Sequence, residues 1–396
     1  MLRFLTAGES HGRSLSVIVE GLPAGLDVRE EDMASELARR RLGYGRGPRM
    51  RFERDELRLL GGVRHGRTLG SPVSVEILNS EWPKWEAEMS AAPGTPSKKL
   101  TAPRPGHADL AGMQKYSFDD ARDVLERASA RETAARVVAG HLAKLLLATL
   151  GVDVLSHVIR IGTAATPDGV RPLPGDLTIV DESEVRCFDA ESEAAMIAEI
   201  KAAAKEGDSL GGIVEVIAYG VPVGLGSHVH WDRKLDGLLA GALMSIQAVK
   251  AVEIGDGVTQ AGQRGSVSHD AIAIDQGFTR GGGYVRRSDH AGGLEGGISS
   301  GAPIIAKVAM KPLATLNRPV LETVDVATGE STVSFKERTD VTAVPALGVV
   351  GEAMMSLVLA NEALRKFGGD SVEEFTRNHA GYVAHLGSTA SAARSD

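Results

Sequence analysis

Segments with helical periodicity and short β-type runs are interleaved along this 396-residue chain, without the strict alternation of a doubly wound sheet. Helices are predicted over 29–43, 131–151, 189–207, 231–252, 344–369 and 371–386. Strands are predicted within 14–23, 73–79, 152–162, 212–222 and 303–310. Several of these strands look like parts of hairpins. We therefore expect an α+β fold, a sandwich in which antiparallel sheets and helices form layers.

The chain shows no linker, low-complexity run or clear repeat. We expect one domain over 1–386 and a flexible C-terminal tail over 387–396. The N-terminus has no apolar run of signal-peptide length, and no segment is expected to span a membrane, which takes about 18 apolar residues. The single cysteine, Cys187, cannot form an internal disulfide, so a reducing cytoplasm is the expected location.

Positive charge is concentrated in the stretch RRRLGYGRGPRMRFER, residues 39–54, although the whole chain has a formal net charge of −8. Aromatic residues make up only 4% of the chain. Net acidity and few aromatics argue against nucleic acid as the partner. The 47 glycines indicate many turns and close backbone approaches to a ligand. The arginine stretch therefore predicts a local pocket for a small anion.

Several Gly-rich or turn-like segments each carry a polar functional group: GESHG (8–12), RPGHADL (104–110), ERASARET (126–133), SDHAGGLEGGISSGAP (288–303) and KERTDVTAVPA (336–346). Taken singly, each has an ordinary structural explanation, such as a turn, a helix cap or a surface ion pair. The chain has no Walker A motif and no His/Cys spacing typical of a metal site. The glycine loop at 43–47 follows a helix, which excludes a Rossmann fingerprint.

Taken together and in order, these segments resemble the chorismate synthase family from near residue 1 to about residue 355. The resemblance also covers DSLGGIVEV, IGDG and KPLAT. It implies a β-α-β sandwich that assembles as a homotetramer. It also implies an enzyme that converts 5-enolpyruvylshikimate-3-phosphate to chorismate with loss of phosphate and a C6 hydrogen. Family members require reduced FMN, although the reaction is redox-neutral overall.

The resemblance assigns catalytic roles by motif position. It implies that His11 protonates the leaving phosphate, that His107 supplies a proton or balances charge near the flavin, and that Asp340 assists deprotonation at C6 through the flavin N5. It places the anionic substrate against Ser10, Arg40, Arg46, Arg49, Ser129, Arg131 and Arg338. Guanidinium groups suit this task because they stay ionised and bind carboxylate or phosphate bidentately.

The resemblance also implies FMN contacts in five segments: Arg127, Ala128 and Ser129; Gln247 and Ala248; Gly296; Lys311, Pro312, Leu313, Ala314 and Thr315; and Arg338. Lys311 is the expected partner of the FMN phosphate because of its charge. Gln247 and Ala248 fall inside the predicted 231–252 helix, whose apolar character suggests burial against the isoalloxazine ring.

Three positions depart from the family pattern. Ala128 and Thr339 stand where many members have Ser and His, and Asp289 stands where Asn is usual. No extra domain or dinucleotide fingerprint is visible, so NADPH is expected only as an indirect reductant that acts through an external flavin reductase. The alternatives are a non-catalytic flavin or anion carrier on the same scaffold, and a nucleic-acid-binding protein.

Overall fold

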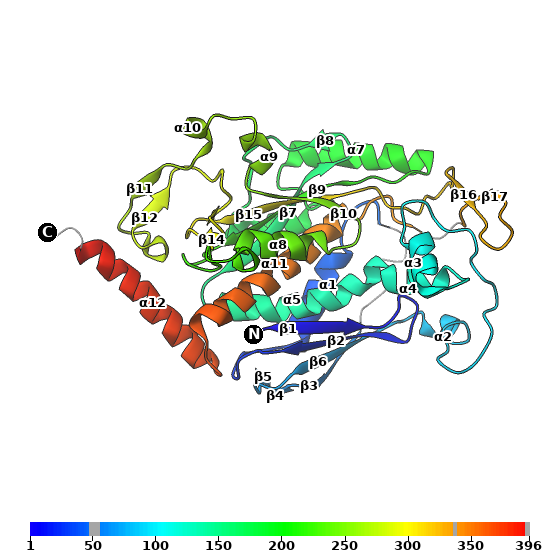
Figure 1. Ribbon diagram of the computed structural model, residues 1–396, viewed down its shortest axis with the longest axis horizontal. Helices are drawn as coiled ribbons and strands as arrows, with labels where there is room; N and C mark the ends of the chain where they lie inside the picture. The colour runs from blue at the N-terminus through cyan, green and yellow to red at the C-terminus, as the bar shows by residue number, and fades with distance from the viewer. Residues whose placement is uncertain (47–55, 336–338, 393–396) are drawn as a thin grey trace.

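Two antiparallel sheets enclose a layer of helices (Figure 1). The computed structural model describes residues 1–46, 56–335 and 339–392, with side chains to residue 386. The N-terminal sheet has the strand order β1 (Arg3–Ala7), β2 (Ser14–Glu20), β6 (Val73–Leu78) and β3 (Leu57–Gly61). The second sheet has the order β10 (Val249–Ile254), β15 (Ile304–Met310), β9 (Gly212–Tyr219), β7 (Asp153–Ile161) and β8 (Ala164–Ala165). The predicted α+β sandwich is confirmed.

Alternation of side chains explains why the N-terminal sheet covers the helices with one face only. In β2, Leu15, Val17 and Val19 are buried while the residues between them are more exposed. The facing strand β6 repeats this pattern with Val73 and Val75, which share the inner face with the valines of β2. Successive side chains of a strand point to opposite faces, so the apolar face packs on the helix layer.

The helix layer consists mainly of α5 (Thr133–Ala148) and α11 (Val344–Phe367), with α1 (Glu30–Arg41) and α8 (Leu235–Met244) beside them. α5 packs on β2 and α11 packs on β7 and β9, so the pair bridges the two sheets. At the crossing of α5 and α11, a Cβ on Gly140 would lie 2.2 Å from the Cβ of Ala353. Only glycine permits so close an approach of the two helices.

A buried network of charged side chains ties α1 to α5 and α11. Glu352 of α11 has no solvent exposure and accepts hydrogen bonds from Arg39, Lys144 and Arg186 at 2.8, 2.6 and 3.1 Å. Burial alone would raise the pKa of Glu352, but these three cations outweigh it and lower the pKa. The network fixes the last turn of α1, from which the arginine stretch begins.

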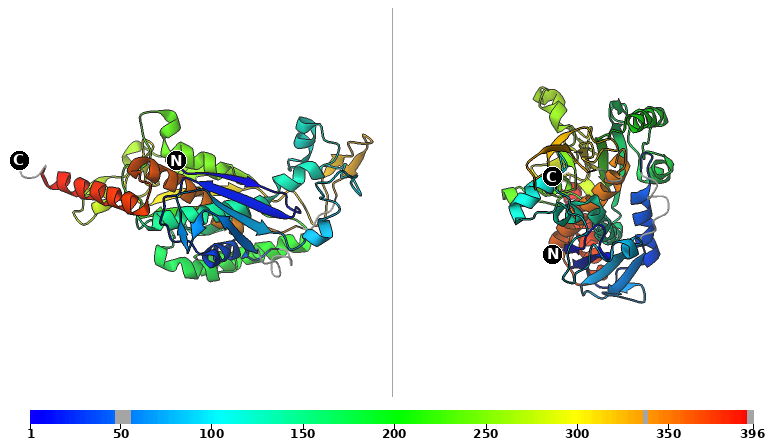
Figure 2. Two further views of the ribbon diagram at one scale, coloured as in Figure 1. Left: turned by 90° about the horizontal axis from the view of Figure 1, so that it is seen from below. Right: turned by 90° about the vertical axis from the view of Figure 1, so that its right-hand side faces the viewer.

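The remaining elements extend from the two ends of the sandwich. One end carries α2 (Trp82–Trp85), α3 (Asp109–Tyr116), α4 (Arg122–Ala128) and the hairpin of β16 (Glu322–Val324) and β17 (Ser331–Val333). The opposite end carries α12 (Val372–Ala392) and the hairpin β11 (Ile272–Ile274)–β12 (Tyr284–Arg286). The hairpin β13 (Leu294–Glu295)–β14 (Ile298–Ser299) contacts α8. Figures 1 and 2 both show α12 and β16–β17 at opposite ends of the molecule. Shorter elements are β4 (Val63–Arg64), β5 (Arg67–Thr68), α6 (Leu177–Glu182), α7 (Ala190–Glu206), α9 (Gly257–Gln260) and α10 (Gly265–Ser268).

The predicted helix over 231–252 is wrong in its second half. A 3₁₀ turn at Trp231–Arg233 leads into α8, which ends at Met244, and β10 begins at Val249. Val252 and Ile254 of β10 alternate with polar neighbours, and the strand pairs antiparallel with β15. This sheet pairing overrides the helix that the apolar run predicted. The last predicted helix continues beyond residue 386, since α12 extends to Ala392.

One helix corrects the expectation that no segment reaches the length and apolarity of a membrane span. α11 has 24 residues and a mean hydropathy of 1.5 over its most apolar 18-residue window. Of that window, 89% is buried inside the protein. α11 is therefore the core helix of the sandwich, and its apolar surface is matched by the sheets and by α5.

Candidate active site

The beginning of α5 gathers four of the side chains predicted to bind substrate. Ser129 follows α4 in an extended conformation, and its Oγ accepts a hydrogen bond from the backbone N–H of Arg131 at 3.3 Å. This hydroxyl lies 3.2 Å from the Oγ of Ser10, in the loop between β1 and β2. Arg40, at the end of α1, donates to the carbonyl of Ala130 at 2.9 Å. Three distant segments thus meet at a helix start, where the helix dipole favours an anion.

Arg46 and Asp340, predicted to bind substrate and to act at C6, form an ion pair. The Nε of Arg46 lies 3.0 Å from Oδ2 of Asp340. The two segments are joined beside the pair, where the Val341 N–H donates to the carbonyl of Gly45 at 2.8 Å. Gly45 has φ +84°, and a Cβ there would lie 2.9 Å from the side chain of Ile200. Glycine therefore allows the close approach that places Arg46 against Asp340.

His11 is held by a buried carboxylate. Nδ1 of His11 lies 2.9 Å from Oε1 of Glu126, and Arg122 donates to the same oxygen at 3.0 Å. The indole of Trp85 covers the imidazole at a centroid distance of 4.0 Å. Burial would raise the pKa of Glu126, but hydrogen bonds from His11 and the charge of Arg122 outweigh it and lower the pKa. Glu126 is therefore an ionised acceptor near neutral pH.

His107 is held in a similar way within one short loop. Its Nδ1 contacts Oδ1 of Asp109, which is fully buried, and Nε of Arg104 donates to Oδ2 of Asp109 at 2.8 Å. The Arg104 guanidinium also lies within hydrogen-bond distance of Nδ1 of His107. Because Nδ1 cannot donate to Asp109 and accept from Arg104 at the same time, the nearer carboxylate of Asp109 is the partner of Nδ1. The Arg104 guanidinium further donates to Thr315, in the KPLAT segment, at 2.9 Å.

The segments predicted to bind FMN are linked by a chain of hydrogen bonds. Arg127 donates to the hydroxyl of Thr6 at 2.7 Å, and Thr6 donates to Glu132 at 2.7 Å. Nε2 of Gln247 donates to the same carboxylate at 3.1 Å. Glu132 therefore joins the end of α4 to the turn between α8 and β10.

The chain of contacts continues from that turn to the His107 loop. The backbone N–H of Lys311 donates to the carbonyl of Ala248 at 3.0 Å, and the Lys311 ammonium donates to the carbonyl of Gly106. Gln247 and Ala248 lie in a turn, not in a buried helix, and Ala248 has φ +64°, an uncommon conformation for a residue with a Cβ. Four of the five predicted FMN segments lie in the described part of the chain. Three of these four, the segments of Arg127, Gln247 and Lys311, are joined by these hydrogen bonds.

Gly296 is the exception. It lies exposed in the turn of the β13–β14 hairpin, near His228. The strand β14 lies in the half of the molecule away from β16–β17 (Figure 1). The structure does not bring it together with the other predicted FMN contacts. Arg49 and Arg338 lie outside the described residues, and their predicted roles stay predictions.

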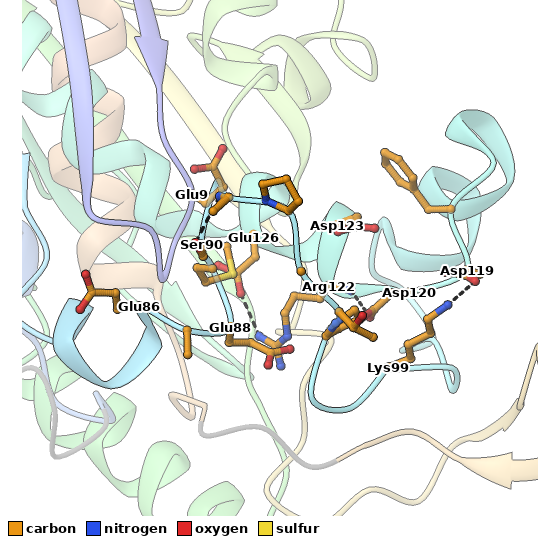
Figure 3. Close-up of a pocket in the computed structure, with 18 of the residues that line it drawn as sticks. Glu9, Glu86, Glu88, Ser90, Lys99, Asp119, Asp120, Arg122, Asp123 and Glu126 are labelled. Carbon is orange, nitrogen blue, oxygen red and sulfur yellow. Dashed lines mark hydrogen bonds and ion pairs between the residues drawn. The ribbon is translucent and has the colours of Figure 1, made fainter.

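A cavity of about 1100 Å³ lies beside the His11 site, between α4 and the loop that follows α2 (Figure 3). Its charged lining comprises Glu9, Glu86, Glu88, Asp119, Asp120, Asp123 and Glu126 against Lys99 and Arg122. An excess of carboxylates disfavours a multiply charged anion. A second cavity of about 480 Å³ lies beside His107 and is lined in part by Leu110, Val324 and Val326. None of the described side chains predicted to bind substrate lines the larger, acidic cavity.

Sequence reasoning missed the carboxylates that hold the two histidines. Asp109 follows His107 in RPGHAD, where Arg104 was also visible, so the close spacing was a usable signal. Glu126 directly precedes the predicted contact Arg127, but nothing in the sequence pairs it with His11, 115 positions away. Trp85 likewise gave no signal.

Comparison with known proteins gives one consistent family. The model described as chorismate synthase matches residues 2–364. The chain is 58% identical over 395 residues to the chorismate synthase of Salinispora tropica, covering 98% of this chain and 99% of that one. It is 59% identical over 396 residues to that of Frankia alni, with the same coverage. A crystal structure of chorismate synthase superposes with a TM-score of 0.79 at 40% identity over 98% of both chains.

Proposed function

Because this chain belongs to the chorismate synthase family, we propose that it carries out a 1,4-elimination on 5-enolpyruvylshikimate-3-phosphate. A proton leaves C6, the electron pair moves through the ring, and the C3–O bond breaks to give chorismate and inorganic phosphate. The observation that carries this proposal is the meeting of Ser10, Ser129 and Arg131 beside His11 at the beginning of α5. The hydroxyl groups of Ser10 and Ser129 thus lie together in the segment next to one candidate acid.

Substrate binding falls to the arginines and serines around α5. The substrate has two carboxylates and a phosphate, and Arg40, Arg46 and Arg131 supply permanent positive charge. Arg40 and Arg46 are largely buried, so their attraction for an anion is screened less than at the surface. Ser10 and Ser129 add hydroxyl donors.

His11 would donate a proton to the leaving phosphate. Its Nδ1 is engaged by Glu126, so Nε2 is the atom available to the substrate. Trp85 lies against one face of the imidazole, with the ring centroids 4.0 Å apart and the planes tilted by 31°. A protonated phosphate is a better leaving group, so the proton would lower the barrier to breaking the C3–O bond.

Asp340 would assist the removal of the proton at C6. In the structure its carboxylate is paired with Arg46, which places it among the proposed substrate-binding groups. An incoming carboxylate or phosphate would compete for Arg46 and release Asp340 toward the substrate. The base would thus become available when substrate binds.

The residues at the α8–β10 turn fit a bound flavin. Oε1 of Gln247 is buried and, among the described residues, has no hydrogen-bond partner, so it suits a ring N–H donor. Lys311 and Arg127 supply charge for the FMN phosphate from neighbouring segments. Reduced FMN, when bound, would lend electron density to the elimination and recover it. Gln247, Lys311 and Arg127 would bind the FMN and orient it.

The remaining expectations belong to the same proposal. We place the enzyme in the cytoplasm as a homotetramer, supplied with reduced flavin by an external reductase, with NADPH acting only indirectly. Gly296 lies apart from the other proposed flavin contacts within one chain, and its role stays a prediction.

The test is anaerobic phosphate release from 5-enolpyruvylshikimate-3-phosphate with photoreduced FMN and with oxidised FMN side by side. We expect release with reduced flavin only. Release with both would remove the flavin redox state from the mechanism. Release with neither, in a protein that still binds FMN by titration, would identify a non-catalytic flavin carrier.

A further inference from the structure

Glu126 fixes His11 through several contacts at once. Its Oε2 accepts the backbone N–H of His11 at 2.8 Å, and its Oε1 faces Nδ1 at 2.9 Å. Its own carbonyl accepts the N–H of Ser10 at 2.9 Å. One residue of α4 thereby holds both the backbone and the ring of the loop that carries His11.

These contacts determine which ring nitrogen is available. An ionised carboxylate can only accept hydrogen bonds, so Nδ1 of His11 must carry a proton. No partner for Nε2 is found within residues 1–46, 56–335 and 339–386. Nε2 is therefore the nitrogen that can exchange a proton with a ligand, and Glu126 decides this.

The surroundings make Glu126 a rigid acceptor and exclude it as a second acid. Its side chain is only 2% exposed, and Arg122 donates to it at 3.0 Å (Figure 3). The Arg122 guanidinium also lies over the Trp85 ring, 5.0 Å from its centroid, while the Trp85 ring lies against that of His11 at a centroid distance of 4.0 Å. Arg122, Glu126, His11 and Trp85 thus form a closed ring of contacts.

We propose that Glu126 is a positioning residue that fixes His11 in the Nδ1–H form and aims Nε2 at the leaving phosphate. The role in catalysis rests on the proposed function, whereas the tautomer of His11 does not. Carboxylates that hold a catalytic imidazole in this way act on turnover more than on substrate affinity.

The tautomer is tested by ¹⁵N NMR of histidine-labelled protein, from about pH 5 to 9, with His11→Asn to assign the signal. In the wild type we expect Nδ1 protonated and Nε2 unprotonated whenever the ring is neutral. In Glu126→Gln we expect a mixture of tautomers. An unchanged spectrum in Glu126→Gln, with the fold intact by circular dichroism, would overturn the proposal.

Kinetics provide the second arm. Glu126→Gln should lower kcat for phosphate release by about 10²–10⁴-fold, with KM within a factor of about three and an altered pH profile. Glu126→Asp, which keeps the charge, should recover part of this loss. Asp123→Asn is the matched control, because Asp123 is an exposed carboxylate on the same helix and cavity, and its kcat should not change. Equal losses in Glu126→Gln and Asp123→Asn would overturn the proposal.

The two arms separate this inference from the proposed function. Absence of phosphate release in the wild type would refute the proposed function, and the NMR arm would still decide the role of Glu126. Normal turnover of Glu126→Gln in an active enzyme would refute only the inference.

Discussion

His11 and His107 are each held by a buried carboxylate that an arginine holds in turn, but the two groups are built differently. Arg104, His107 and Asp109 lie within six positions of one loop, and Asp109 makes two hydrogen bonds with the Arg104 guanidinium. His11 and Glu126 are 115 positions apart and meet only because the β1–β2 loop packs on α4. The first group depends on local sequence, and the second depends on the whole fold.

The difference has energetic consequences. Asp109 has no solvent exposure, and removing it would leave the buried Arg104 without its main partner. Glu126 faces an open cavity through Arg122, so water can compensate part of its loss. We therefore expect the His107 group to matter more for stability and the His11 group more for turnover.

The largest effect should come from the two histidines themselves. His11→Ala should lower kcat by about 10²–10⁴-fold and leave FMN affinity little changed, since within the described residues His11 makes no hydrogen bond to a predicted flavin contact. His107→Ala should lower both, because its loop is tied to Lys311 and Thr315. Steady-state kinetics with FMN titration of each variant would check this. Equal loss of flavin affinity in both variants would contradict the division of roles.

The next effect concerns stability. Asp109→Ala should lower the free energy of unfolding by about 3–5 kcal/mol, since it leaves Arg104 buried and uncompensated. Glu126→Ala should cost less, about 1–3 kcal/mol. Urea unfolding of both variants at pH 7 would measure the difference. A larger loss in Glu126→Ala would reverse the comparison.

Acid should distinguish the same two groups. Burial opposes ionisation of Asp109, but hydrogen bonds from His107 and Arg104 hold its pKa well below the usual range. Its stabilising contribution is therefore complete above about pH 4 and is lost as pH falls through the folded pKa. Asp109→Asn should show a flatter decline of unfolding free energy below pH 4 than the wild type, and Glu126→Gln a smaller flattening. Identical slopes in all three proteins would refute the assignment.

The smallest effect should come from Ala128, where many relatives have serine. Ala128→Ser restores a hydroxyl beside Arg127 and Ser129. A new hydrogen bond is worth about 0.5–1.5 kcal/mol, so FMN should bind up to about tenfold more tightly, with kcat unchanged. Fluorescence titration with FMN would measure it, and a change in kcat with no gain in affinity would contradict a flavin contact at this position.

Local patterns predicted most of the framework. The helices α1, α5, α7 and α11 were predicted within a few residues of their observed ends, because caps and apolar periodicity agree there. The error lay at 231–252, where an apolar run continued across a turn into β10. Pairing with β15, which no local pattern reveals, decides that segment.

The site could be predicted only in part. Motif order placed Ser10, Ser129 and Arg131, which the structure does bring together. The pairing of Arg46 with Asp340 and of His11 with Glu126 depends on long-range packing, and one sequence contains no signal for it. Gly296 shows the opposite case, since its motif matches but its position lies apart from the other contacts.

The position of α11 in the chain also determines the order in which the protein can fold during synthesis. At least 343 residues precede this helix, and translation at about 5–20 residues per second takes roughly 20–70 s to produce them. Until α11 emerges from the ribosome, the second sheet lacks the helix that packs on β7 and β9, and the apolar side chains of that face stay exposed on the nascent chain. The part of the core around β7 and β9 therefore forms only after α11 has been synthesised, and chains that terminate before residue 344 should be substrates for chaperones and proteases.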